Sequence, residues 1–203
     1  MLLGPDGVGK SSVINGIGSG WSAGFRECKS YHLRPIPFRR QRQPETNCDP
    51  HGKPARGTLV SVFKLVYLLL ANWLGYLAAV RPQLAQGTLV LFDRYFPDCL
   101  VDPKRYRLPP SCQCITKLIA SLLPEPDLYL VLDAPMSVLQ QRKREVTQEE
   151  SERQRKAYAM GLARLPNLAV VDAARPLAEV VEGVLGRVIE LHLAGSREGF
   201  KVA

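Results

Sequence analysis

The chain has 203 residues, of which 46% are hydrophobic and 23% are charged, and its formal net charge is +8. This length suits one α/β domain with a substantial core, and the composition excludes a low-complexity or short-repeat chain. The positive charge indicates an anionic partner. We interpret that partner as nucleotide phosphate, because the basic clusters are scattered and no nucleic-acid-binding motif accompanies them. The odd number of cysteines, five, does not indicate a secreted disulfide framework.

The first dozen residues carry the strongest motif. Gly4, four further residues, and then Gly9, Lys10 and Ser11 fit the phosphate-binding loop G-x-x-x-x-G-K-[ST] at every fixed position. In such a loop the backbone amides surround phosphate oxygens, the lysine adds a cation for the β- and γ-phosphates, and the serine hydroxyl can bind Mg²⁺. We therefore predict a site for ATP and Mg²⁺. The residues predicted to bind ATP are Gly4, Asp6, Gly7, Val8, Gly9, Lys10, Ser11 and Ser12.

Only Met1-Leu2-Leu3 precede the loop, where a central strand of about five or six residues is expected. Either the first strand is unusually short or the start is trimmed. A helix is predicted from Lys10 to Ile17, where a cluster of glycines ends it. A second strand is predicted over 25–33, followed by a loop over 35–58 that holds five prolines. Loops of this length in compact domains are usually functional or mobile.

Residues 59–80 form a long apolar segment with a single charge, Lys64. As a helix its 22 residues would span about 33 Å, enough to cross a bilayer. We favour a buried crossover helix instead, because Ser61, Lys64 and Asn72 fall on one narrow polar stripe. A membrane crossing would also separate the phosphate loop from the strand that follows this helix. No transmembrane span is therefore predicted, and peripheral membrane contact is the lesser alternative.

Residues 88–93 form a continuous apolar run that ends in Asp93, as a buried parallel strand does. An acid at the carboxyl end of such a strand lies beside the phosphate loop and can hold Mg²⁺, so the predicted metal ligands are Ser11 and Asp93. Strands and helices continue to alternate after this point. The further predicted strands are 127–133 and 168–172, and the further predicted helices are 114–123, 135–144, 151–165 and 176–193.

This alternation predicts an α/β fold, a three-layer P-loop NTPase architecture with a parallel sheet of about five strands. Residues 1–193 are expected to form a single domain, and residues 194–203 a flexible tail. The polar segment at 145–152, between two helices, is predicted to be a mobile lid, because it offers little apolar surface to anchor it.

Several segments together resemble the thymidylate kinase family of P-loop nucleotide kinases. The loop from Gly4 to Ser11, with Asp6 inside it, is similar to the family's G-x-D-G-x-G-K-[ST]. The other similar segments are 86–95, like the family's strand ending in D-R-Y; 127–135, like its fourth strand; 142–155, like its Arg-rich lid; and 167–180, like its closing strand and helix. The resemblance covers nearly the whole chain and implies a nucleoside monophosphate kinase-like fold.

The resemblance also implies roles for individual residues. Asp6 would face the acceptor sugar hydroxyl, Arg94 would bridge the reacting phosphates, and Arg34 would approach the acceptor phosphate. The implied catalytic residues are Lys10, Asp93, Arg94, Arg142 and Arg153, the last two from the lid. The implied substrate-binding residues are Asp6, Arg34, Leu69, Trp73, Arg94 and Tyr95.

The acceptor-binding helix departs from the family at two positions. The family carries an aromatic residue for the base and an arginine for the acceptor phosphate, whereas this chain has Leu69 and Trp73 there. Leu3 stands where a glutamate commonly precedes the phosphate loop. The phosphate-transfer half therefore matches the family and the base-reading half does not. We expect dTMP to be a weak acceptor or one of several.

The predicted function is ATP-dependent phosphoryl transfer to a small acceptor, most simply a nucleoside monophosphate such as dTMP. Two alternatives stay open: a kinase for nucleosides or other small molecules on the same fold, and a non-catalytic nucleotide-binding module. A GTPase switch is disfavoured, because the sequence has no N-K-x-D segment to read guanine. The expected partners are nucleotide substrates and not nucleic acid, with a homodimer also considered. Because the chain enters the phosphate loop at once, without room for a signal peptide, the expected location is cytoplasmic.

Overall fold

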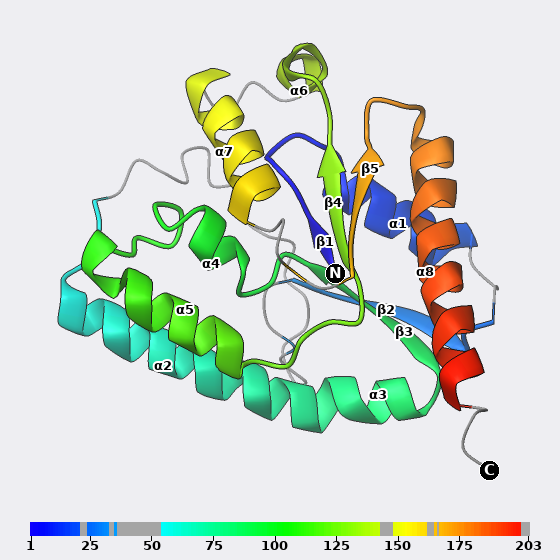
Figure 1. The fold of residues 1–203 in the computed structure, drawn as a ribbon, viewed down its shortest axis with the longest axis horizontal. Helices are drawn as coiled ribbons and strands as arrows, with labels where there is room; N and C mark the ends of the chain where they lie inside the picture. The colour runs from blue at the N-terminus through cyan, green and yellow to red at the C-terminus, as the bar shows by residue number, and fades with distance from the viewer. Residues whose placement is uncertain are drawn as a thin grey trace.

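The computed structural model describes residues 1–20, 24–32, 35, 54–142, 148–161, 165 and 167–199. Five strands form one sheet: β1 (Leu2–Leu3), β2 (Glu27–His32), β3 (Thr88–Asp93), β4 (Tyr129–Asp133) and β5 (Leu168–Asp172). All their pairings are parallel, and their order across the sheet is β2-β3-β1-β4-β5 (Figure 1). The predicted parallel sheet of about five strands is confirmed.

Helices cover both faces of this sheet (Figure 1). The α-helices are α1 (Lys10–Gly20), α2 (Thr58–Gly75), α3 (Arg81–Ala85), α4 (Asp98–Val101), α5 (Gln113–Leu122), α6 (Met136–Arg142), α7 (Gln148–Gly161) and α8 (Leu177–Gly199). A π-helical turn, η1 (Tyr76–Val80), joins α2 to α3, and a 3-10 turn, η2 (Pro110–Cys112), precedes α5.

The two faces of the sheet bury separate apolar cores. On one face Leu2 packs with Val13 of α1 and Val184 of α8. On the other face Leu3 packs with Leu65 of α2. Successive residues of β1 thus point into opposite cores, because side chains alternate along a strand. This arrangement confirms the three-layer architecture.

The described elements differ from the predicted ones mainly at their ends. Helix α7 begins at Gln148, so the predicted lid at 145–152 overlaps its first turns, while 143–147 lie outside the described residues. Helix α8 continues past the predicted end at 193 to Gly199, into the segment predicted to be a tail. Amphipathic periodicity locates such helices well, but their last turns depend on contacts that the pattern does not contain.

Helix α2 differs most, because its predicted burial is wrong. The polar stripe faces inward, where Ser61 and Asn72 are 0% and 2% exposed. The apolar side faces outward, with Leu59, Phe63 and Leu74 exposed to 76%, 74% and 68%. Helix α2 is therefore a crossover helix at the surface, which buries Leu65 and Leu68 but leaves many of its large apolar side chains exposed.

Close packing on the inner side explains this orientation. A Cβ at Gly75 would lie 1.9 Å from the carbonyl oxygen of Pro35, so only glycine fits there. Lys64 also points inward, and its Nζ donates to the carbonyl of Tyr106 at 2.6 Å. By length and composition alone, residues Thr58–Ala85 could cross a membrane. In this fold, however, α2 packs along α5 and leads through α3 directly into β3 (Figure 1).

Candidate active site

The phosphate loop joins the carboxyl end of β1 to α1 near the centre of the sheet. Gly4 has φ 142° and Gly9 has φ 101°, conformations that residues with a Cβ rarely adopt. A Cβ at Gly4 would also lie 2.4 Å from the carbonyl oxygen of Leu132 on β4. Ser11 and Ser12 follow in the exposed first turn of α1. The first amides of this helix lack helical partners and carry the positive end of its dipole, as a phosphate site requires.

Lys10 is held inside the loop. Its side chain is 6% exposed, and Nζ donates to the carbonyl oxygens of Gly4 at 2.7 Å and Pro5 at 2.9 Å. Burial, aided by the positive charge of Arg94, lowers the pKa of Lys10 from 10.5 to about 7. A bound phosphate would favour the protonated amine and raise this pKa again.

Nucleotide binding is therefore expected to take up protons. At pH 8 Lys10, with its pKa of about 7, is mostly neutral in the free protein. It becomes charged when a triphosphate binds, so uptake approaches about one proton per nucleotide, and affinity falls as the pH rises above 7. Calorimetric titration of a non-hydrolysable ATP analogue, in buffers of different ionisation enthalpy, measures this uptake. Lys10→Arg, which stays protonated, should show none; equal uptake by that variant would assign the proton to another group.

Asp93 ends β3 at the predicted magnesium position. Its Oδ2 lies 3.4 Å from Nδ1 of His32 on β2, and its Oδ1 is buried with no hydrogen-bond partner among the described residues. Burial opposes ionisation of Asp93, but the hydrogen bond from His32 and the charge of Lys10 outweigh it, so the pKa lies below its usual value. An ionised oxygen without a partner beside the loop fits a cation, and carboxylate and hydroxyl oxygens suit Mg²⁺.

A second group of charges, the Asp6 cluster, consists of Asp6, Arg94 and Arg105. Nη1 of Arg105 donates to both carboxylate oxygens of Asp6, at 2.8 and 3.0 Å, and Nη2 of Arg94 donates to Oδ1. Burial disfavours the charge on Asp6, but the two arginines outweigh it and hold the pKa of Asp6 well below its usual range. Arg94 has φ 68°, a left-handed conformation that is uncommon outside glycine and concentrates at functional sites.

Asp98, in α4, holds Arg94 from its other side. Its side chain is fully buried and accepts hydrogen bonds from Nη1 of Arg94 at 2.8 Å, from the hydroxyl of Tyr106 at 2.8 Å, and from the hydroxyl of Tyr158. These partners outweigh burial and lower the pKa of Asp98. Because Tyr158 belongs to α7, the Asp98 carboxylate connects the end of β3 to that helix.

Helix α7 also contacts the phosphate loop itself. Gln154 is 2% exposed, and its Oε1 accepts the backbone N–H of Asp6 at 3.2 Å. Its Nε2 donates to Asp102 at 3.4 Å, and Arg153 donates to the same carboxylate at 3.0 Å. Helix α7 is thus docked on the loop in this structure.

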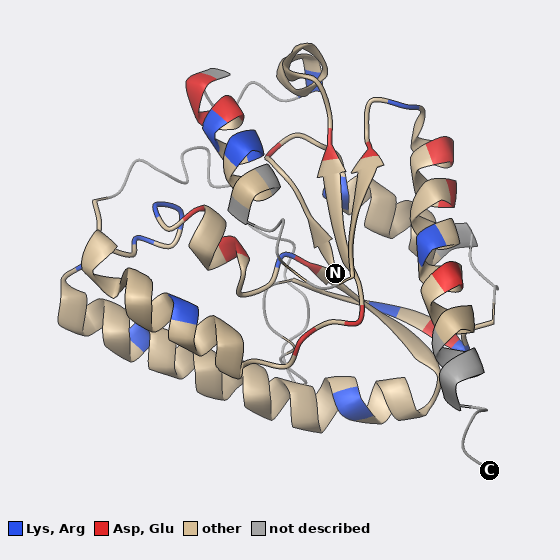
Figure 2. Ribbon diagram, viewed as in Figure 1, with Lys and Arg blue, Asp and Glu red and all other residues tan. Residues whose placement is uncertain are grey.

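The two predicted lid arginines have different partners. Nη1 of Arg142 donates to the carbonyls of Ala173 at 2.8 Å and Val8 at 3.4 Å, so this side chain lies against the loop backbone. Arg153 instead lies among carboxylates. Figure 2 shows that charges of both signs gather at this edge of the sheet, where acidic residues end β4 and β5 and α7 carries both signs.

The other described residues that were predicted to bind the acceptor substrate lie in the core or between helices. Leu69 packs against the apolar core below α2. Nε1 of Trp73 donates to the carbonyl of Leu122 at 2.9 Å and so ties α2 to α5. The hydroxyl of Tyr95 donates to the carbonyl of Pro124 at 3.2 Å. Arg34 lies outside the described residues.

The site residues that were not predicted include Asp98, Arg105, Gln154 and Tyr158. Asp98 stands four residues after Arg94, but Arg94 follows β3 in a left-handed conformation and α4 begins only at Asp98, so the helical spacing rule does not predict this pair. The same spacing places Gln154 and Tyr158 on one face of α7. Arg105 was visible only as a member of a basic cluster, since nothing local indicates that its loop returns to Asp6.

Solved structures support the fold. Thymidylate kinase from Ehrlichia chaffeensis matches with a TM-score of 0.59 and 14% identity, over 92% of this chain and 96% of that one. Deoxyadenosine kinase from M. mycoides, with bound dATP, matches with a TM-score of 0.57 and 17% identity, over 92% of this chain and 97% of that one. No family model and no curated protein matches the sequence. At these identities the likeness carries information on the fold alone.

Proposed function

We propose that this chain, which has the fold of the thymidylate kinase-like P-loop nucleotide kinases, transfers the γ-phosphoryl group of ATP to a phosphorylated small acceptor, most simply a nucleoside monophosphate. The Asp6 cluster carries the proposal, because Arg94 and Arg105 converge next to the phosphate loop. Two guanidinium groups at one point suit oxyanions, which arginine binds through paired hydrogen bonds.

In this reaction an oxygen of the acceptor phosphate attacks the γ-phosphorus, and the bond from that phosphorus to the β–γ bridging oxygen breaks, which releases ADP. The loop amides and Lys10 hold the donor phosphates, and Arg94 offsets charge on the transferring group. Mg²⁺, when bound by Ser11 and Asp93, would supply further charge neutralisation. Arg142 and Arg153 are the candidates for additional contacts from the lid.

The ion pairs of Asp6 with Arg94 and Arg105 favour a phosphate acceptor over a hydroxyl acceptor that would use Asp6 as its base. A hydroxyl must lose its proton, and an efficient general base has a pKa near the working pH. Asp6, paired with Arg94 and Arg105, is a much weaker base than that. A phosphate oxygen is already ionised near neutral pH and needs no base. A nucleoside kinase remains the second candidate, favoured by Trp73 at the family's acceptor-arginine position.

In this chain Trp73 stands where the family has an arginine for the acceptor phosphate. Arg105 is the described residue best placed to replace that arginine, because it already binds the carboxylate of Asp6. Arg105→Ala should raise the KM for a nucleoside monophosphate by roughly 10- to 100-fold, the loss of one charged hydrogen bond of about 1.5–3 kcal/mol, and leave the KM for ATP unchanged. Arg107→Ala is the matched control, since Nε of Arg107 donates to the Pro54 carbonyl at the surface at 2.9 Å. An equal effect of both substitutions would contradict this role.

A panel of nucleosides and nucleoside monophosphates, with ATP and Mg²⁺, tests the proposed function. Turnover with monophosphates, dTMP included but not alone, is the expected result. Turnover with nucleosides only would favour the second candidate, and ATP consumption that no acceptor increases would favour a non-catalytic nucleotide-binding module. Strict specificity for dTMP would contradict the expectation drawn from Leu69 and Trp73.

We also propose that the enzyme is a cytoplasmic homodimer that associates through the outer face of α2. Nine side chains form this face: Leu59, Val60, Phe63, Val66, Tyr67, Leu70, Trp73, Leu74 and Leu77. They expose on the order of 1,000 Å² of apolar surface, and a standard interface needs about 800 Å² per partner. A membrane surface fits less well, since interfacial helices carry several Lys or Arg, whereas the single charge of α2, Lys64, points inward.

Leu74→Glu should therefore shift the protein from dimer to monomer, because it places a charge in the apolar interface. Sedimentation velocity at micromolar concentration measures the change. Leu193→Glu is the control, since Leu193 is 54% exposed on α8, away from this face (Figure 1). A wild-type protein that is monomeric, or that instead binds lipid vesicles, would refute the dimer.

A further inference from the structure

The side chain of Gln154 joins helix α7 to the phosphate loop. It is 2% exposed, its Oε1 accepts the backbone N–H of Asp6 at 3.2 Å, and its Nε2 donates to Oδ2 of Asp102 at 3.4 Å. These two partners fix the orientation of the amide. A backbone N–H needs the carbonyl oxygen and a carboxylate needs the NH₂ group, so the reverse orientation would bring two donors together and two acceptors together.

Two buried contacts hold Gln154 and its helix against α4. Asp98 and Asp102 are four residues apart, and their side chains are 0% and 1% exposed. Gln154 and Tyr158 are also four residues apart and share one face of α7. At one end of the interface Tyr158 donates to Asp98. At the other end Gln154 donates to Asp102. Because both contacts are made by buried side chains, α7 cannot slide along α4 without leaving a buried carboxylate short of a donor.

Asp6 is thus held at both its backbone and its side chain. Its carboxylate accepts hydrogen bonds from Arg94 and Arg105, the two residues proposed to bind the acceptor phosphate. The next residue, Gly7, has φ 82° and no Cβ, so the loop backbone on that side restrains Asp6 little. The hydrogen bond from the Asp6 N–H to Gln154 therefore restricts where the carboxylate, and with it the two guanidinium groups, can lie.

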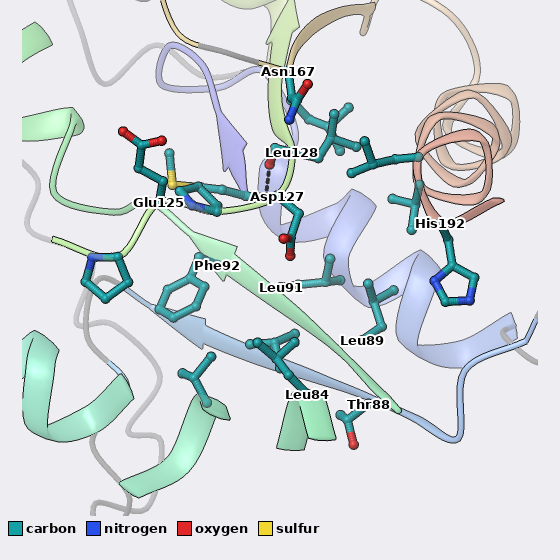
Figure 3. A pocket seen from close by; sticks show the side chains of 18 of the residues that line it. Leu84, Thr88, Leu89, Leu91, Phe92, Glu125, Asp127, Leu128, Asn167 and His192 are labelled. Carbon is teal, nitrogen blue, oxygen red and sulfur yellow. Dashed lines mark hydrogen bonds between the residues drawn. The ribbon is translucent and has the colours of Figure 1, made fainter. Parts of the chain in front are cut away.

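The cavity in the structure does not supply this restraint. It has a volume of about 900 Å³ and lies along β3, with Leu89, Leu91 and Phe92 among its lining residues (Figure 3). Neither Gln154 nor any member of the Asp6 cluster lines it. The position of the cluster thus depends on polar contacts from α4 and α7.

We propose that Gln154 is a positioning residue, which fixes Asp6 and thereby sets the place of the acceptor phosphate relative to the loop that holds ATP. This inference rests on the proposed function, in which Arg94 and Arg105 bind that phosphate. Transfer requires the attacking oxygen to lie in line, within about 3–3.5 Å of the γ-phosphorus, so a small displacement of the cluster lowers the rate or the affinity. Gln154 acts through Asp6 and need not touch either substrate.

Gln154→Met tests this role, because it removes both hydrogen bonds with little change in volume or helix propensity. It should raise the KM for the best nucleoside monophosphate of the panel by about tenfold, the net effect of losing one buried hydrogen bond. The KM for ATP should stay within about twofold, because the loop amides and Lys10 keep their places. A role in stability alone would lower Tm and leave both KM values unchanged. Lys156→Met, on the same helix at a side chain 71% exposed, is the matched control and should change neither KM.

The backbone amide of Asp6 reports on the tether without any substrate. In the ligand-free protein, Gln154→Met should speed hydrogen exchange of this amide by about tenfold or more, because its acceptor is gone. Lys156→Met should leave the exchange unchanged. Exchange followed by NMR measures the amide directly.

A reversed pair provides the rescue. Gln154→Glu keeps an oxygen for the Asp6 N–H but places a second buried carboxylate against Asp102, so it should raise the KM for the monophosphate at least as much as Gln154→Met. Adding Asp102→Asn restores one donor and one acceptor with their places exchanged, since the asparagine amide donates to the new carboxylate. The double variant should recover at least about fivefold of the loss, while Arg153 keeps its bonds to Glu150.

Unchanged exchange of the Asp6 amide in Gln154→Met, or a double variant no better than Gln154→Glu, would overturn the positioning role. Equal rises in the KM for ATP and for the monophosphate would also overturn it, because Gln154 would then shape the whole loop. Failure of the proposed function would look different. The wild-type protein would phosphorylate no monophosphate of the panel, whereas the Asp6 amide would still respond to Gln154→Met.

Discussion

Lys10→Ala should lower the rate of phosphoryl transfer by about 10²- to 10³-fold, the range found when one electrostatic contact to a transition state is removed. The reason is the position of Lys10, buried inside the loop with its Nζ on the carbonyls of Gly4 and Pro5. The amine can exchange those carbonyls for β- and γ-phosphate oxygens without leaving the site. Steady-state kinetics with ATP, Mg²⁺ and the best acceptor of the panel measure the loss.

Lys117→Ala, on the exposed surface of α5, is the matched control and should keep full activity. The thermal midpoint of Lys10→Ala should not fall below that of wild type, because a lysine whose pKa is lowered by burial opposes folding. Turnover within a factor of about two of wild type would remove Lys10 from the mechanism, since it corresponds to less than 0.5 kcal/mol of the barrier.

Asp98→Ala should destabilise the fold by about 3–5 kcal/mol, the usual result of removing one partner from a buried ion pair. Arg94 is 8% exposed and would keep Asp6 as its only charged partner among the described contacts. Tyr106 and Tyr158 would lose the acceptor of their hydroxyl groups. Urea denaturation followed by circular dichroism measures the change.

Asp98→Asn keeps one carbonyl acceptor and should lose less stability than Asp98→Ala. Glu190→Ala, which breaks an exposed pair with Arg187, should have no measurable effect.

The stability that Asp98 contributes depends on pH with a definite sign. The pKa of Asp98 is lowered in the folded state, so its contribution is present above the ordinary pKa near 4 and disappears as the pH falls through the folded value. An Asp98→Ala protein as stable as wild type would mean that the network contributes nothing net.

The sequence was most informative where function requires fixed residue types at fixed spacing. The phosphate loop was readable because glycines at 4 and 9 are needed for backbone shape and Lys10 for charge. The apolar run ending in Asp93 was readable because a strand buried on both faces lacks polar residues. These local constraints also identified the sheet, since strands that alternate with helices have few arrangements.

Features that depend on distant contacts were not predictable in this way. Helix α2 was expected to hide its apolar side, but its inner face is decided by close contacts such as Gly75 on Pro35, which periodicity does not report. Arg105 reaches Asp6 across a separation of 99 residues. Leu69 and Trp73 could be aligned with a family pattern, but the rotation of their helix decides what they face.

The central position of β1 has a consequence for how the protein is made. Leu2 and Leu3 are made long before β4, since Met1 bonds to Leu128 across a separation of 127 residues. At about 5–20 residues per second, the partners on β4 follow only after roughly 6–25 s. Until β3 is made the first strand has no neighbouring strand to pair with, and the apolar run at residues 58–85 emerges before β3 and β4. Nascent chains of this topology fold late and are exposed to aggregation, so we expect their yield to depend on translation speed and on chaperones.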